Sequence, residues 1–313
     1  MHDIYFRAMG CRCRIVADGV SEDEAVRARQ TIERLDGLWS RFRPTSEVSK
    51  VNGSGGALCV VSPETMRLFS MAAAAQRETS GLFDPFMLNQ LMRLGYSRSF
   101  ETIRGRDIRI SQGEEPITTD CSLSRLQLFP EISAVALSSG CSFDPGGIGK
   151  GLAADIVTEQ LLAAGATTAY VEVGGDTAFA GTSWTGEQWV VEIGHPDDDS
   201  TVATISSPGG AIATSSTQGR RWHVGGVVVH HILDPSTGRP ADTDLVGVSV
   251  AGGTAAWAEV CAKSILIAGS QMARHLADRF CVAGLAITDE GNLIDLGTES
   301  SVEVGRRGVE VAA

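Results

Sequence analysis

The chain is short of positive charge. Its 313 residues include 26 Lys and Arg against 38 Asp and Glu, which gives a formal net charge of −12. A protein that binds nucleic acid needs a basic face to neutralise phosphates, so this balance argues against such a partner. The hydrophobic content of 43% is ordinary for a globular protein with a large core.

Cysteine patterns that hold metals or exchange disulfides are also missing. The seven cysteines are scattered, and no C-x-x-C pair occurs, which disfavours a zinc ribbon or a thioredoxin-like site. We therefore expect free, mostly buried thiols in a reducing compartment.

Long apolar runs are absent as well. No stretch reaches the length of a membrane span, and the N-terminal residues MHDIYFRAMGCRCRI carry charges instead of an apolar run. These features predict a cytoplasmic protein without a signal peptide and without a membrane partner.

A linker rich in proline or serine is the last absence, so we expect one compact α+β domain over residues 1–313. Ser21 and Glu24 would form a capping box at the first helix. Apolar spacing predicts helices over 21–43, 63–79, 151–164, 254–268 and 270–279. A hairpin is expected over 4–17, and single strands over 168–173, 245–251, 281–288 and 293–296. We also expect a solvated turn at 112–116 and an extended or turning segment at 40–52.

What the chain does have is a cluster of glycines around a lysine. Residues 143–151 read FDPGGIGKG, and a helix is expected to begin beside Lys150. Glycines let backbone N–H groups approach a ligand, and a helix N-terminus near a lysine favours phosphate. The spacing is not that of a P-loop and fits the Rossmann pattern poorly. The segment is either a tight turn or a site for a phosphorylated ligand such as a nucleotide.

Two further segments combine polar side chains with turns. VGGD at 173–176 is either a hairpin turn or a close backbone approach to a ligand beside Asp176. HHILDPSTGRP at 230–240 places two histidines near Asp234. Adjacent strand residues point to opposite faces, so only one of these histidines can enter a given site.

Glu259 and Lys263 lie four residues apart in the predicted helix TAAWAEVCAKS. They form either an ordinary ion pair on the helix surface or part of a ligand cleft, where the acid could hold Mg²⁺ against phosphate oxygens. LFDP at 82–85 and SRFRP at 40–44 are either loop packing or ligand contacts, since Phe42 could stack on a flat ring.

Taken in order, these segments resemble the FAD:protein FMN transferase family, also called ApbE-like. The resemblance runs from Met9 to about Gly269, and the order and spacing of its pieces are highly specific. The matching pieces are MG at 9–10, S-x-F-R-P-x-S-E-x-S-x-x-N at 40–52, FDP at 83–85, D-x-GGI-x-KG at 144–151, GGD at 174–176, ATS at 213–215 and H-I-x-DP-x-TG at 231–238.

The resemblance implies an α+β, T-fold-like architecture of mixed and antiparallel sheets flanked by helices, with FAD in a central cleft. It implies Mg²⁺-dependent transfer of FMN from FAD to a Thr or Ser hydroxyl of an acceptor flavoprotein with a D-G-x-S/T-G-A-T motif, releasing AMP. This chain lacks that motif, so it is not expected to modify itself.

Site residues follow from the resemblance position by position. His231 and Lys263 would serve in catalysis, His231 as general base for the acceptor hydroxyl. Gly147, Ala256 and Glu259 would lie at the metal. Contacts to FAD would come from Met9, Phe42, Leu82, Phe83, Asp84, Asp144, Lys150, Gly175, Asp176 and Ile232.

One departure from the family pattern concerns the metal. The family usually has Asp, and then Thr four residues later, where this chain has Glu259 and Lys263. A protonated lysine cannot ligate Mg²⁺ and repels it. We therefore expect one metal ion or none at this position.

Two other functions use the same residues. With water as the nucleophile the protein would be an FAD pyrophosphatase, and without catalysis it would be an FAD-binding protein. We expect a monomer or a homodimer.

Overall fold

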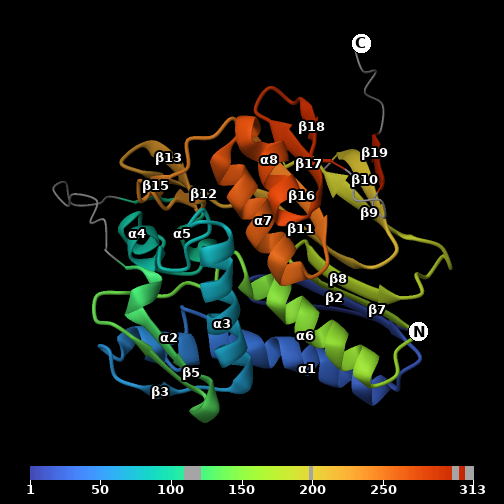
Figure 1. Ribbon diagram of the computed structural model, residues 1–313, viewed down its shortest axis with the longest axis horizontal. Coiled ribbons are helices and arrows are strands. Elements are labelled where there is room, and N and C mark those ends of the chain that lie inside the picture. The colour runs from blue at the N-terminus through green and yellow to red at the C-terminus, as the bar shows by residue number, and fades with distance from the viewer. Residues whose placement is uncertain (109–120, 197–199, 298–302, 307–313) are drawn as a thin grey trace. The chain divides into compact units, whose positions relative to one another are not determined.

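The structure is a computed structural model that describes residues 1–108, 121–196, 200–297 and 303–306. The chain divides into two compact units (Figure 1). Unit 1 comprises Met1–Ile32, Lys150–Gly219 and Thr243–Ala313, and unit 2 comprises Glu33–Gly149 and Arg220–Asp242.

Unit 1 is built on an eight-stranded sheet in the order β1-β2-β7-β8-β11-β16-β17-β18, in which every neighbouring pair is antiparallel. Its strands are β1 (His2–Ala8), β2 (Cys11–Asp18), β7 (Thr168–Val173), β8 (Asp176–Gly181), β11 (Gly210–Ser216), β16 (Leu245–Gly252), β17 (Ala283–Thr288) and β18 (Leu293–Asp295). A smaller sheet joins β9 (Trp189–Gly194), β10 (Thr201–Ser207) and β19 (Glu303–Arg306).

Helices cover one face of the large sheet (Figure 1). α7 (Ala255–Ala268) packs on β11 and β16, and α8 (Ser270–Phe280) packs on β17. α6 (Gly149–Ala163) contributes Val157 and Leu161 to the core on this side. α1 (Glu22–Trp39) begins in unit 1 and continues into unit 2.

Alternation along the strands gives the sheet two buried faces. Ile15 and Val171 pack with the helices, while Val16 and Tyr170 point to the opposite face and share a core with Ile205 of β10. Successive side chains of a strand point to opposite faces, as these do, and the strand predicted over 168–173 is confirmed.

Unit 2 combines short helices with small sheets. Its core joins Trp222 to Tyr96, whose rings lie 5.3 Å apart, and the indole N–H donates to the Leu94 carbonyl at 2.7 Å. The helices are α2 (Glu47–Gly53), α3 (Pro63–Glu78), α4 (Leu88–Arg93) and α5 (Phe100–Ile103). The sheets are β3 (Cys59–Val60) with β6 (Ala134–Leu137) and β5 (Leu126–Phe129), β13 (Val227–His230) with β12 (Arg221–Val224) and β4 (Asp107–Ile108), and β14 (Leu233–Asp234) with β15 (Arg239–Pro240).

The long helices agree with their apolar spacing, and the capping box is confirmed: the Glu24 N–H donates to the Ser21 hydroxyl at 3.3 Å, and the Ser21 N–H donates to the Glu24 carboxylate at 3.0 Å. α2 was not expected. Ser46 caps it, and its buried residues Val48 and Val51 are too few to show a helical period. The turn predicted at 112–116 lies outside the described residues.

No helix among the described residues combines the length and the apolar character needed to cross a membrane.

Candidate functional site

The first turn of α6 carries Lys150, whose ammonium group lies between two acidic side chains. Its Nζ donates to Oδ2 of Asp176 and lies 3.4 Å from Oε1 of Glu259. Asp176 begins β8 and is fully buried, and Glu259 on α7 is 3% exposed. Three elements that are distant in the sequence therefore bring two buried carboxylates and one ammonium group together in unit 1.

Backbone N–H groups hold the same two carboxylates. The Thr214 N–H donates to Oδ1 of Asp176 at 3.3 Å, and the Gly151 N–H donates to Oε2 of Glu259 at 2.9 Å. Burial raises the pKa of Asp176 to about 7; the ammonium group of Lys150 opposes this rise, and the Glu259 carboxylate adds to it. Asp176 therefore holds its proton to a higher pH than an ordinary aspartate does.

Two hairpin turns bring further expected residues to this end of the sheet. Met9 is the first residue of the turn between β1 and β2 and has a φ of 52°. Gly174 and Gly175 form the turn between β7 and β8, with φ of 63° and 91°. A Cβ on Gly174 would lie 2.8 Å from Sγ of Cys11 and 3.5 Å from Cδ of Lys150. The turn needs glycine there because these side chains pack against its backbone.

The acidic pair does not fit the magnesium site that the resemblance implies. Mg²⁺ requires oxygen ligands in a near-octahedral shell at about 2.0–2.1 Å. Here the carboxylate oxygens already bind the ammonium group of Lys150, and Lys263 adds a second positive charge on α7, one turn after Glu259. Among the described residues, no group of three or more His, Cys, Asp or Glu could hold a metal ion. The side chains present suit an ammonium ion better than Mg²⁺.

Unit 2 holds other expected flavin residues around Arg41. The guanidinium lies over the rings of Phe42 and Tyr96, at 4.2 and 4.4 Å from their centroids, and donates to the Tyr96 carbonyl at 2.8 Å. Its Nε lies 3.6 Å from Oδ1 of Asp144, which also accepts the Gly146 N–H at 3.1 Å. Phe42 is 39% exposed, so part of its ring can stack on a flat ligand.

Other residues of the motif at 40–52 hold the backbone around Arg41 and Asp144 through hydrogen bonds. The Asn52 side chain donates to the Phe143 carbonyl at 2.9 Å and accepts the Phe143 N–H at 2.7 Å, which fixes the residue before Asp144. The Glu47 carboxylate accepts the N–H and the hydroxyl of Ser62, the N-cap of α3. These motif residues hold the backbone in place.

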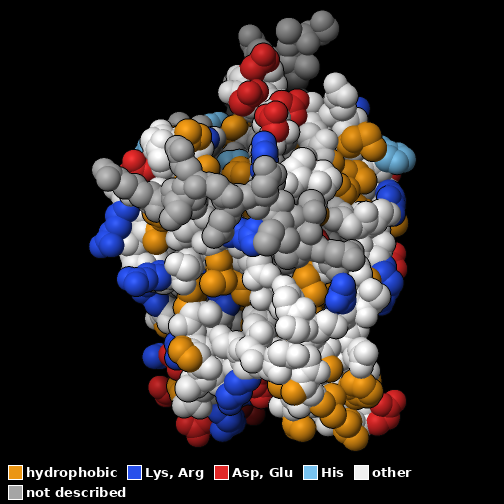
Figure 2. All heavy atoms as spheres, turned by 90° about the vertical axis from the view of Figure 1, so that its left-hand side faces the viewer, with side chains coloured by type: hydrophobic (Ala, Val, Ile, Leu, Met, Phe, Trp, Pro, Cys, Tyr) orange, Lys and Arg blue, Asp and Glu red, His pale blue; other side chains and the backbone are white. Residues whose placement is uncertain are grey.

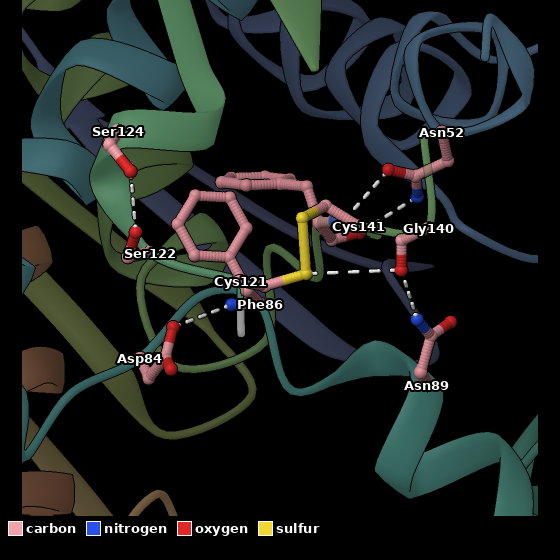
Figure 3. The surroundings of a disulfide bond; sticks show 10 residues. Asn52, Asp84, Phe86, Asn89, Cys121, Ser122, Ser124, Gly140 and Cys141 are labelled. Carbon is pink, nitrogen blue, oxygen red and sulfur yellow. Dashed lines mark hydrogen bonds between the residues drawn. A yellow bond between two sulfur atoms is a disulfide. The ribbon is translucent and has the colours of Figure 1, made fainter. Parts of the chain in front are cut away.

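The LFDP segment divides between packing and turn formation. Phe83 is fully buried, and its N–H donates to the Thr79 hydroxyl at 3.1 Å. Asp84 accepts the Phe86 N–H at 2.9 Å (Figure 3), and Leu82 is half-buried. The Phe83 side chain therefore belongs to the core of unit 2.

The histidine segment lies at the end of β13. His231 is half-buried, and the next residue, Ile232, is 3% exposed. Burial lowers the pKa of His230. Asp234 accepts the N–H and the hydroxyl of Ser236, each at 2.8 Å, so its carboxylate closes its own turn.

Cys121 and Cys141 form a disulfide bond (Figure 3). This corrects the expectation that all seven cysteines are free; the other five are Cys11, Cys13, Cys59, Cys261 and Cys281. The bonded pair is 20 residues apart, and only the folding of the chain brings the two residues together. Beside it, Asn89 donates to the Gly140 carbonyl at 2.9 Å. Disulfides persist mainly in oxidising compartments, which bears on the expected location.

Acidic side chains gather near the top of the face drawn in Figure 2. Lys and Arg are scattered over the rest of this face. A basic stripe, as nucleic-acid binders present, is not seen in this view.

The sequence matches the model of a known protein family. The model of the ApbE family matches residues 9–285, which cross both units.

This chain belongs to the ApbE family.

Its ApbE relatives include named enzymes. A FAD:protein FMN transferase of Rhodobacter capsulatus is 27% identical over 300 residues, which are 92% of this chain and 55% of that protein. One of Vibrio cholerae is 25% identical over 291 residues, which are 87% of this chain and 83% of that protein. The chain thus spans about half the length of the first relative.

Solved ApbE structures share the fold. The crystal structure of the ApbE protein from Thermotoga maritima matches with a TM-score of 0.81 at 25% identity, over 94% of this chain and 96% of that chain. The flavin transferase ApbE from Vibrio cholerae matches with a TM-score of 0.79 at 22% identity, over 94% and 96%. The expected α+β architecture of sheets flanked by helices is confirmed.

The structure groups the residues expected from the ApbE resemblance by unit. Met9, Lys150, Gly175, Asp176 and Glu259 belong to the arrangement in unit 1. Phe42 and Asp144 flank Arg41 in unit 2, where Leu82, Phe83, Asp84, Gly147, His231 and Ile232 also lie.

Sequence reasoning does not single out Arg41 and Tyr96, which build the arrangement in unit 2, or Asp155 of α6, whose carboxylate accepts the Ala255 and Ala256 N–H groups. Asp155 had a readable signal, because it is an acid three residues after the buried Leu152 in an apolar helix. Arg41 lies within the motif at 40–52, at a position that the motif leaves variable. Tyr96 had no signal, because it comes from a distant segment.

Proposed function

We propose that this ApbE protein transfers FMN from FAD to a Thr or Ser hydroxyl of an acceptor flavoprotein and releases AMP. The family match over residues 9–285 and the enzyme names of the relatives support this activity. The family match also supports treating 1–313 as a single flavin transferase domain, because it runs through both units.

The observation that carries the proposal is the ammonium group of Lys150 at the start of α6. In the transfer, the acceptor oxygen forms a bond to the phosphorus of the FMN half, and the bond from that phosphorus to the bridging oxygen breaks. The electron pair of the broken bond leaves with AMP. Negative charge on the phosphoryl oxygens has to be neutralised, and Lys150 with the positive end of the α6 dipole supplies that stabilisation.

The remaining roles follow from the family motifs. His231 takes the proton of the acceptor hydroxyl as general base. Phe42 stacks on the flavin ring, supported by Arg41. Met9, Leu82, Phe83, Asp84, Asp144, Gly175, Asp176 and Ile232 complete the contacts to FAD, with Phe83 and Ile232 shaping them from the core.

Magnesium has a weaker part in this proposal than in the family pattern. Gly147, Ala256 and Glu259 are the positions expected at the metal, but the Glu259 carboxylate accepts the Gly151 N–H and lies beside Lys150. We propose that transfer by this chain depends only weakly on Mg²⁺, with Lys150 and Lys263 supplying positive charge.

The acceptor is proposed to carry a D-G-x-S/T-G-A-T motif, and the transferase to act in the cytoplasm as a monomer or homodimer. The Cys121–Cys141 disulfide argues for examining the location directly, by fractionation of cells that express the natural protein.

The activity is tested by incubating the purified protein with FAD and an acceptor domain that carries the motif, with and without Mg²⁺. The expected result is AMP release matched by fluorescent flavin on the acceptor in a denaturing gel. An acceptor with alanine at the motif Thr is the control. AMP without an acceptor would identify a pyrophosphatase, and tight FAD binding without AMP would identify a binding protein.

A further inference from the structure

Asp155 of α6 holds the beginning of α7. Its side chain is 6% exposed; Oδ1 accepts the Ala255 N–H at 2.7 Å, and Oδ2 accepts the Ala256 N–H at 2.9 Å. The first N–H groups of a helix have no partner within the helix, so a carboxylate from another helix satisfies two of them and complements the helix dipole.

The same arrangement occurs in the opposite direction. Glu259 of α7 accepts the N–H of Gly151 in the first turn of α6 at 2.9 Å. Each helix therefore supplies the acid that caps the other. A Cβ on Gly151 would lie 2.3 Å from the Ala255 carbonyl oxygen, so the two helix ends approach as closely as their backbones allow.

The length of the Glu259 side chain fits this task. Glu259 uses its length to reach the Gly151 N–H with Oε2 while Oε1 stays 3.4 Å from Nζ of Lys150.

We propose that Asp155 and Glu259 form a reciprocal cap between α6 and α7. In this arrangement Asp155 is a positioning residue: by holding α7, it keeps Glu259 in place, and Glu259 in turn fixes the position of the Lys150 ammonium group. The role in transfer rests on the proposed function, whereas the cap itself does not. If the cap loosens, Glu259 leaves the Gly151 N–H, and Lys150 loses one of the two carboxylates that fix it.

A matched control exists on the same helix. Thr254 is the N-cap of α7, and its hydroxyl accepts the Trp257 N–H at 3.3 Å. Thr254→Ala removes a cap of α7 without removing a bond to α6. Both Thr254→Ala and Asp155→Asn should lower the melting temperature by a few degrees, because each removes capping bonds.

Only Asp155→Asn should impair transfer beyond its effect on stability. We expect its kcat for AMP release to fall by roughly tenfold to a hundredfold with the KM for FAD within about twofold, since a displacement of about 1 Å has that effect. Thr254→Ala should keep the wild-type kcat. Equal kcat losses in the two variants would overturn the proposal, and so would an Asp155→Asn enzyme with the wild-type kcat.

A measurement without turnover keeps the cap testable if the transfer activity is not found. Amide hydrogen exchange followed by NMR should speed up in Asp155→Asn at Ala255 and Ala256, and also at Gly151, whose N–H is held by the Glu259 carboxylate. In Thr254→Ala the exchange at Gly151 should stay as in the wild type. Unchanged exchange at Gly151 in Asp155→Asn would refute the coupling between the two caps.

A double-mutant cycle gives a third readout. Because both residues act through one helix contact, Asp155→Asn with Glu259→Gln should lower kcat little more than the worse single variant. Multiplying effects would show that the two residues act separately and would contradict the reciprocal cap.

Discussion

Lys150 of unit 1 and Arg41 of unit 2 are both cations beside carboxylates, but they are held by different forces. Lys150 lies between Asp176 and Glu259, whose side chains are 0% and 4% exposed. Arg41 lies 3.6 Å from Asp144 and is held mainly by two aromatic rings and the Tyr96 carbonyl. Charge fixes the first cation, and packing fixes the second.

The difference follows from how deeply the two acids are buried, since each of them also accepts one backbone N–H. Asp144 also accepts the Gly146 N–H, so it does not depend on Arg41 alone. Asp176 is fully buried, and within the part of the chain that the structure describes it also accepts the Thr214 N–H at 3.3 Å. A buried carboxylate that loses its cation is much more costly than a partly exposed one. The cation of unit 1 is therefore more important for stability than the cation of unit 2.

Replacing Lys150 should have the largest effect. Lys150→Met leaves two buried acids without their cation, so we expect the free energy of unfolding to fall by about 3 kcal/mol and AMP release to be lost. Urea unfolding at pH 7 measures the first quantity. Adding Asp176→Asn should restore part of the stability and none of the activity. A loss of stability in Lys150→Met no larger than in a surface Lys→Met variant would contradict this prediction.

Replacing Arg41 should cost less. Arg41→Met keeps an apolar stem against Phe42 and Tyr96 but loses the hydrogen bond to the Tyr96 carbonyl, so we expect a loss of about 1–2 kcal/mol. The affinity for FAD, measured by titration of flavin fluorescence, should fall more than stability does, because the ring of Phe42 loses the guanidinium that lies over it. The comparison between the two cations fails if Arg41→Met destabilises the protein more than Lys150→Met.

The pH dependence of stability should separate the two regions further. The folded-state pKa of Asp176 is raised to about 7, above its ordinary value of 3.8, so the folded chain holds this proton more tightly than the unfolded chain. The resulting contribution to stability is complete below about pH 4 and is lost as pH rises through 7. The difference in unfolding free energy between wild type and Asp176→Asn should decline between about pH 4 and pH 7, which thermal unfolding measures. A difference in unfolding free energy that does not change with pH would show that Asp176 does not take up this proton.

Replacing Lys263 should have the smallest effect on stability and the clearest effect on metal binding. Lys263→Thr removes one positive charge and adds a hydroxyl oxygen, so we expect Mn²⁺ affinity to rise by roughly tenfold or more, which is about 1.4 kcal/mol. Electron paramagnetic resonance of free Mn²⁺ measures it. Lys263→Met, which removes the charge without adding an oxygen, should gain less. Tight Mn²⁺ binding by the wild-type chain would show that Lys263 does not oppose the metal.

Local sequence rules described the long elements well and the short ones poorly. The helix α1 and the strand β7 follow from periodicity that repeats over many residues. α2 and α4 have seven and six residues, too few to show a period, and are stabilised by Ser46 capping or by the core of unit 2. The disulfide could not be foreseen, because pairing depends on distance in space.

The sequence by itself determined the family, the approximate positions of the long helices and strands, and the chemical types at the site: a lysine after glycines, an acid after a glycine turn, an acid on a late helix. These follow from order and spacing along one chain. Tertiary structure alone decided that Lys150 meets Asp176 and Glu259, that Asp234 serves its own turn, and that Asp155 and Glu259 cap each other's helices. The physical reason is that hydrogen bonds and ion pairs act over a few ångströms, and only packing of the sheet and helices brings residues more than one hundred positions apart, such as Gly151 and Glu259, within that range.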